Sequence, residues 1–203
     1  MLPEKFSTHP YETLPLQPVG IIVGLVLVAV YGWMFASPAK SIALMKKLPR
    51  NQVAGQIVMG IGLAWFWLLI APEGKGLLSS LTFEMGEFAI AKKALQVAVP
   101  VCYFLLVVYA KEFLFVRGLG VLMLVAAAPI LGASFLEAPQ SRLLLPILAY
   151  SLIFKGLFYI GQPYLFRDGV TVLSASHGRW RMATGFGLAY GITVLVCAFL
   201  FWG

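Results

Sequence analysis

The sequence predicts an all-α integral membrane protein, a bundle of six transmembrane helices, from three observations. Of the 203 residues, 61% are apolar and only 11% are charged, with a mean hydropathy of +0.91, whereas charged residues make up about a quarter of ordinary soluble domains. The apolar residues fall into six blocks of 17 to 20, the length that a helix needs to cross a bilayer. Because the blocks are continuous and do not alternate, they predict helices and not a transmembrane barrel.

The six predicted spans are residues 19–36, 53–71, 94–110, 119–136, 143–160 and 183–202. Of the 15 Lys and Arg and 8 Asp and Glu, only Lys155 lies inside them, as expected when a charge at the centre of a span costs about 2.5 to 3.5 kcal/mol on insertion scales. Residues 1–18 are expected to form an extramembrane tail, because their prolines and charges do not fit a signal peptide. The transmembrane domain is then residues 19–203.

The connections between the spans differ in positive charge. Nine Lys and Arg lie in the first, third and fifth connections, against five in the tail and the other connections. The positive-inside rule therefore predicts a multi-pass protein of the bacterial inner membrane with both termini outside the cytoplasm. Lys92 and Lys93, next to the third span, oppose this orientation. The net charge of +7 fits attraction to anionic lipid head groups, so membrane lipids are the expected partner and nucleic acid is not.

Two connections have their own patterns. Ser37-Pro38 resembles a helix start, so residues 39–48 predict either a short helix in the head-group layer or a solvated connector. The second connection, residues 74–93, predicts a helix that begins near Ser79 and continues into the third span. There Glu84 and Glu87 share a helix face; such a pair can hold a cation or act as acid and base, but a solvated face is the simpler interpretation.

A weak internal similarity joins two other connections. Residues 113–118 and 164–169 both combine two aromatic residues, a leucine, an arginine and a glycine. Together with the basic first connection, this pattern suggests three similar helical hairpins. Aromatic residues followed by arginine are also typical of any membrane boundary.

Small residues at helical spacing mark expected helix–helix seams, because close van der Waals contact is a main source of helix association in lipid. They are Gly20, Gly24, Gly60, Ala64, Ala128, Gly132, Ala183, Gly187 and Gly191. Packing within the chain is favoured over packing against other membrane subunits or in a homo-oligomer. Prolines within the third, fourth and fifth spans are the expected helix kinks, and the carbonyls that they free are able to line a site. They are Pro100, Pro129 and Pro146.

Lys155 is the one intramembrane charge that the sequence predicts. It lies five residues from the predicted cytoplasmic end of its span, so its stem is long enough to carry the ammonium group to the interface. This snorkelling position is favoured over a buried functional role.

The fifth connection, residues 161–182, is the richest in chemistry. Its candidate lipid or anion contacts are Arg167, His177, Arg179, Trp180 and Arg181. Catalysis by Ser174 or Ser176 with His177 is less favoured, because neighbouring positions alone do not activate a hydroxyl. Neither a cofactor nor a metal is expected, since the chain has only two histidines and no cluster of ligands.

The second half of the chain carries a faint resemblance. Residues 116–122 with Ala128-Pro129, then residues 163–168 and Arg179-Trp180-Arg181, resemble a group of uncharacterised multi-span proteins of verrucomicrobial-type bacteria. The resemblance implies a polytopic membrane protein and no particular activity.

The spans are poor in polar groups and rich in small-residue rows, which favours a non-enzymatic role as a packing or assembly subunit of a membrane complex. The first alternative is a small-solute or lipid transporter that uses Lys155 and the carbonyls freed by the prolines. The second is a membrane enzyme acting on lipid head groups.

Overall fold

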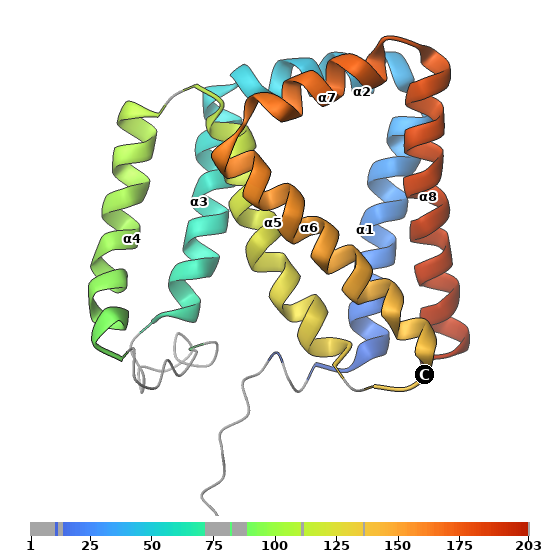
Figure 1. The fold of residues 1–203 in the computed structure, drawn as a ribbon, viewed down its shortest axis with the longest axis horizontal. Helices are drawn as coiled ribbons and strands as arrows, with labels where there is room; N and C mark the ends of the chain where they lie inside the picture. The colour runs from blue at the N-terminus through green and yellow to red at the C-terminus, as the bar shows by residue number, and fades with distance from the viewer. Residues whose placement is uncertain are drawn as a thin grey trace, which may run out of the picture.

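The computed structural model describes Tyr11, residues 14–71, Thr82 and residues 89–110, 112–135 and 137–202. Six of its helices are long and apolar enough to cross a membrane, which confirms the predicted fold class (Figure 1). They are α1 (Leu16–Ala36), α3 (Gln52–Leu69), α4 (Ala89–Tyr109), α5 (Leu114–Ala133), α6 (Leu144–Gly161) and α8 (His177–Leu200). The shorter elements are α2 (Pro38–Lys47), α7 (Tyr164–Ser174) and the 3₁₀ helices η1 (Leu48–Arg50) and η4 (Gln140–Leu143).

Three spanning helices begin five or more residues before the apolar blocks that predicted them. Helices α4 and α5 start five residues earlier than predicted and α8 six residues earlier. Their first turns carry charged residues such as Lys93, Arg117 and Arg179, which an apolar block excludes but a helix emerging from the bilayer accommodates. The fifth connection, residues 161–182, is therefore mostly helical, with α7 and the start of α8, although the sequence predicted no helix there.

Helices α2 and α7 run across the ends of the spanning helices and contact each other (Figure 1). After Ser37 the structure has a helix, α2, with Pro38 in its first turn, which is the first of the two alternatives that the sequence left open for residues 39–48. Helix α7 has an apolar stripe in which Phe166 and Val170 are one turn apart and buried. The helix start expected near Ser79 and the pair Glu84 and Glu87 lie outside the described residues.

The helices pack between hairpins rather than within them. Among the described residues, the two long helices of each hairpin hardly touch each other, namely α1 and α3, α4 and α5, and α6 and α8. Instead, α1 packs against α8, and α5 packs against both α3 and α6 (Figure 1). Among the described residues, the only substantial contacts of α4 are with α3. Each hairpin is therefore splayed. There are two packed groups, α1 with α8 and α3 with α4, α5 and α6; the first and third hairpins have one arm in each group, whereas both arms of the second hairpin pack on α3.

The two packed groups meet at one end of the molecule, which we call the closed end. There a core cluster joins α1, α5, α6 and α8 through residues that include Leu16, Ile130, Leu145 and Val194. At the other end, α2 and α7 connect the groups; we call this the bridged end, and it includes the connection between α4 and α5. A smaller cluster lies there, where Phe166 and Val170 of α7 pack on Val116 of α5.

Candidate functional site

Basic side chains gather at the bridged end. All of them are exposed except Arg117, which is half-buried. They are Lys40, Lys46, Lys47, Arg50, Arg117, Arg167, Arg179 and Arg181. The acidic residues described at this end are Glu112 and Asp168, so the end carries a strong positive excess that is complementary to anions.

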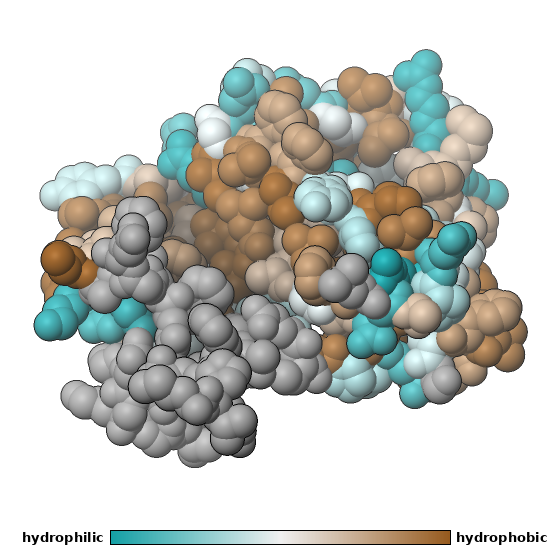
Figure 2. Space-filling view, turned by 60° about the horizontal axis from the view of Figure 1, so that its bottom comes forward, coloured by the Kyte–Doolittle hydropathy of each residue, from teal (hydrophilic) through white to brown (hydrophobic). Residues whose placement is uncertain are grey.

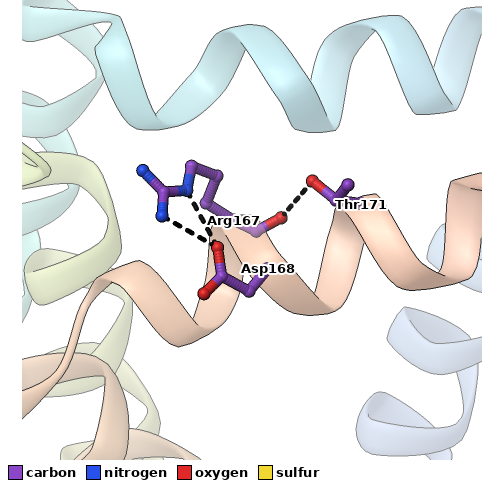
Figure 3. Close-up of polar contacts among 3 residues, drawn as sticks. All are labelled: Arg167, Asp168 and Thr171. Carbon is purple, nitrogen blue, oxygen red and sulfur yellow. Dashed lines mark hydrogen bonds and ion pairs between the residues drawn. The ribbon is translucent and has the colours of Figure 1, made fainter.

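Arg167, one of the candidate anion contacts, is already paired (Figure 3). Its Nε donates a hydrogen bond to Asp168 Oδ1 at 2.9 Å, and one terminal nitrogen lies at 2.9 Å from the same oxygen. Both side chains are more than half exposed, so the pair contributes little stability. Thr171 Oγ1 donates to the Arg167 carbonyl at 2.8 Å on the same side of α7.

His177, Arg179 and Arg181 lie in the first turns of α8 and are exposed. Trp180 lies between the two arginines in sequence but is only 2% exposed, and its indole N–H donates to the Met34 carbonyl at 3.3 Å. Trp180 is therefore a packing residue between α8 and α1, and its ring is not available to a lipid. The remaining candidates for anion or lipid contact at this end are therefore its exposed basic side chains.

The Met34 carbonyl is a junction that the sequence did not predict. It belongs to the last turn of α1, where carbonyls have no partner within the helix. Besides the Trp180 indole, it lies 3.3 Å from the hydroxyl of the fully buried Ser41, which donates at the shorter distance of 3.0 Å to the Pro38 carbonyl. One orphan carbonyl thus holds α2 and α8 to the end of α1.

The hydroxyls near His177 are used for local structure. Ser176 Oγ accepts the Gly178 backbone N–H at 3.2 Å and caps α8, and Ser174 Oγ donates to the Thr171 carbonyl at 3.3 Å. Neither bond involves the imidazole. Within the described residues, no group of three or more His, Cys, Asp or Glu is placed to hold a metal ion.

Lys155 is exposed on α6. It lies one turn before Tyr159, so the two side chains share a face of the helix. Tyr159 packs edge to face against Phe166 of α7, with ring centroids 5.5 Å apart. Lys155 is therefore exposed one turn before the residue that contacts α7, and it lies about 9 Å in helical rise from the end of α6 at Gly161.

The glycine rows of the first and last predicted spans pack against each other. A methyl group on Gly24 would lie 2.6 Å from Leu195 Cγ, and one on Gly191 would lie 2.9 Å from Leu27 Cβ. Likewise, Gly20 faces the Trp202 ring and Gly187 faces the Tyr31 ring. Both rows thus form one α1–α8 seam within the chain; Ala183 is half-buried near its end.

The other predicted rows are placed differently. Gly60 faces the Tyr103 ring of α4, and Gly132 lies against the Tyr11 backbone, whereas Ala64 and Ala128 are exposed.

The remaining close seams use glycines outside the rows that we predicted. Gly118 of α5 meets Met59 of α3, where a methyl group would lie 2.6 Å from the Met59 nitrogen. Gly120 and Gly156 similarly face each other's carbonyl oxygens between α5 and α6. A search for small residues four apart could not find them, because Gly118 packs on Met59 and Gly120 packs on Gly156, and neither contact belongs to a row with that spacing.

The three prolines differ in role. Pro100 and Pro129 lie inside α4 and α5. Pro100 has no N–H to bond the Gln96 carbonyl, and this carbonyl accepts the Trp67 indole N–H from α3 at 3.0 Å. Pro146 lies in the first turn of α6, which begins at Leu144. Backbone N–H groups in the first turn of a helix make no hydrogen bond within the helix, so a proline there removes none. Pro146 is therefore not the mid-helix kink that we expected.

Together, the fold and the placement of charge define a helical multi-pass membrane protein with an exposed basic surface at one end. No protein-family model, curated protein or solved structure matches the chain.

Proposed function

We propose that the protein is a non-enzymatic packing or assembly subunit of a complex in the bacterial inner membrane, and that α4 with the outer side of α3 is the surface that binds a neighbouring subunit. Membrane complexes of this kind associate through helix faces that the fold of a single chain leaves open. The observation that carries the proposal is the sparse attachment of α4.

Among the described residues, α3 is the one helix on which α4 packs to any extent. Val99 is its one buried hydrophobic side chain among the described residues, while Val97 and Phe104 on the far side are 68% and 65% exposed. Its contacts with α3 are largely polar: Gln96 Nε2 donates to the Ile70 carbonyl at 2.7 Å, and Tyr103 donates to the Gln56 carbonyl. A spanning helix held along one narrow stripe leaves most of its circumference for a partner.

The interior supports packing rather than transport. Among the described residues, every buried side-chain nitrogen or oxygen has a hydrogen-bond partner. Ser134 and Thr184 are buried within spans, and each donates to a carbonyl of its own helix. A transport path needs polar groups that are free to replace the solvation of the cargo, and these hydroxyls are already engaged.

Site-specific photo-crosslinking in cells tests the proposed surface. A photoreactive residue at Phe104 should give a discrete adduct with one membrane protein, whereas one at Phe199 of α8, which is similarly exposed at 63%, should give none. A protein that purifies alone as a stable monomer, without any adduct from Phe104, would refute the assembly role.

We also propose that the bridged end faces the cytoplasm, since it carries most of the described basic residues. In a variant without Cys102 and Cys197, a cysteine at Lys46 or Arg179 should react with an impermeant maleimide only after the cytoplasmic side is opened. A cysteine at Ser7 should react in intact spheroplasts. The reverse pattern would invert the orientation and leave the six spans unchanged.

A further inference from the structure

Helix α7 has three different stripes along its length. One stripe is buried, because Phe166 and Val170, one turn apart, pack on α5. A second stripe is polar and exposed, since Arg167 pairs with Asp168 and Thr171 donates to the Arg167 carbonyl (Figure 3). These two stripes leave one further side of the helix.

This third stripe is apolar and exposed. It consists of Leu165, Gly169, Val172 and Leu173, which helical spacing places on one side of α7. All three of its apolar side chains are exposed, and Val172 is 59% exposed. A methyl group on Gly169, in the middle of the stripe, would meet no atom within 4 Å outside its own stretch of helix. No described part of the chain therefore covers the middle of this stripe.

The spanning helices on either side of α7 expose apolar side chains near its two ends. Phe158 lies in the last turn of α6, before α7, and Met182 lies in the second turn of α8, after it; both are exposed. On the face that Figure 2 shows, hydrophobic surface is extensive and hydrophilic residues gather toward its margins. Helix α7 runs across the ends of the spanning helices (Figure 1), at the level where acyl chains meet head groups.

The charge around α7 is complementary to an anionic lipid surface. Helix α2, which contacts α7, has the exposed Lys40, Lys46 and Lys47 and no acidic residue. Helix α8, which follows α7, has the exposed Arg179 and Arg181 in its first turns. An apolar stripe combined with such cations is typical of helices that lie in the head-group layer, and each cation near an anionic leaflet adds attraction.

We propose that α7 lies in the head-group layer of the leaflet at the bridged end, and that this end binds anionic phospholipid. The stripe of Leu165, Gly169 and Val172 contacts the acyl chains close to their head groups, while the cations of α2 and α8 attract the phosphates. The stripe and the charge together select a lipid surface as the occupant, because a free phosphate ester would bind the cations and leave the apolar stripe in water.

Paired labels test the depth of α7. Gly169 and Thr171 are two residues apart and rotated by about 200°, so they lie on opposite sides of the helix. In the full chain without Cys102 and Cys197, an NBD fluorophore is attached at Gly169→Cys or Thr171→Cys, and the protein is reconstituted in vesicles of phosphatidylglycerol and phosphatidylcholine. Quenching by spin labels at two depths along the acyl chain should place the label at Gly169→Cys about 5 to 10 Å deeper.

Two results would overturn the position of α7. One is an equal depth of the two labels. The other is quenching by aqueous iodide that is as strong at Gly169→Cys as at Thr171→Cys, which would leave the stripe for a protein partner. Gel filtration verifies that both variants remain folded, as expected for exposed positions.

The label at Gly169→Cys also tests the choice of lipid. In phosphatidylcholine vesicles, spin-labelled phosphatidylglycerol should quench it as strongly as an about fivefold higher fraction of spin-labelled phosphatidylcholine, since a cation near a charged lipid surface contributes about this factor. The pair Lys47→Gln and Arg179→Gln should lower this preference at least about twofold.

Cations at the opposite end of the spanning helices supply the control for this preference. Lys93 lies near the start of α4 and Arg142 lies just before α6, so the pair Lys93→Gln and Arg142→Gln should leave the preference unchanged. Equal quenching of the wild-type background by the two lipids would overturn the binding of anionic phospholipid. Equal losses in the two pairs of variants would likewise overturn it, because the attraction would then come from the net charge of the whole chain.

Discussion

The α1–α8 pair and the α3–α4 pair show two ways of joining spanning helices. In α1–α8, glycines on each helix receive bulky side chains of the other, as Gly24 receives Leu195 and Gly187 receives Tyr31. In α3–α4, the hydrogen bonds of Gln96 and Trp67 make the principal contacts, and Val99 is the single buried hydrophobic residue described on α4. The first interface depends on shape and the second on a few polar groups.

The difference has a physical origin and a functional consequence. In lipid, burying apolar area between helices gains little, so close van der Waals contact and interhelical hydrogen bonds provide the association. A seam of glycines along a helix does not tolerate added side-chain volume. In an attachment made of separate hydrogen bonds, removing one donor loses the stabilisation of that bond and leaves the other bonds in place. Helix α4 is thus the element whose position a neighbouring subunit is best able to determine.

The largest effect is expected in the glycine seam. Gly24→Ala places a methyl group 2.6 Å from Leu195 Cγ, and overpacking of this kind costs about 1 to 3 kcal/mol in the free energy of unfolding. Gly32→Ala on the same helix is the matched control, because its methyl group would meet only Leu188 Cδ1 at 3.7 Å. Reversible unfolding in mixed micelles measures both. Equal stabilities of the two variants would contradict a shape-dependent seam.

A smaller effect is expected where Pro100 leaves the Gln96 carbonyl free. Trp67→Phe removes the indole donor and should cost about 1 kcal/mol in the free energy of unfolding. Pro100→Ala restores a backbone N–H that bonds this carbonyl, so the same Trp67→Phe change should cost less in the Pro100→Ala protein. The double-mutant cycle measures this coupling. An identical cost in both backgrounds would mean that the indole does not depend on the freed carbonyl.

The fold class could be predicted because exclusion of charge from the bilayer acts on each segment separately. The four-residue spacing of Gly20 and Gly24 could also be predicted from the sequence, because both residues lie in one helix. Helix α7 was missed because its polar stripe, with Arg167 and Asp168, interrupts the apolar run, and an amphipathic helix has no continuous block.

The partners of these features could not be predicted. Trp180 and Met34 are 146 residues apart in sequence, so nothing near Trp180 indicates that a carbonyl of α1 receives its indole. The sequence also could not predict which carbonyl of α4 accepts a hydrogen bond from α3, because this depends on how the two helices are aligned along their axes.

The smallest effect compares two tyrosine hydroxyls, one between α4 and α3 and one between α8 and α6 at the closed end. Tyr103 of α4 donates to the Gln56 carbonyl at 3.5 Å, at the limit of a hydrogen bond, so Tyr103→Phe should cost less than about 0.5 kcal/mol in the free energy of unfolding. Tyr190 of α8 donates to the Leu144 carbonyl through a much shorter bond at the closed end, and Tyr190→Phe should cost about 1 kcal/mol. Unfolding of both variants in the same micelles provides the comparison. If Tyr103→Phe proves the more costly, α4 is held more firmly than its contacts with α3 indicate, and the description of α3–α4 as a sparse attachment fails.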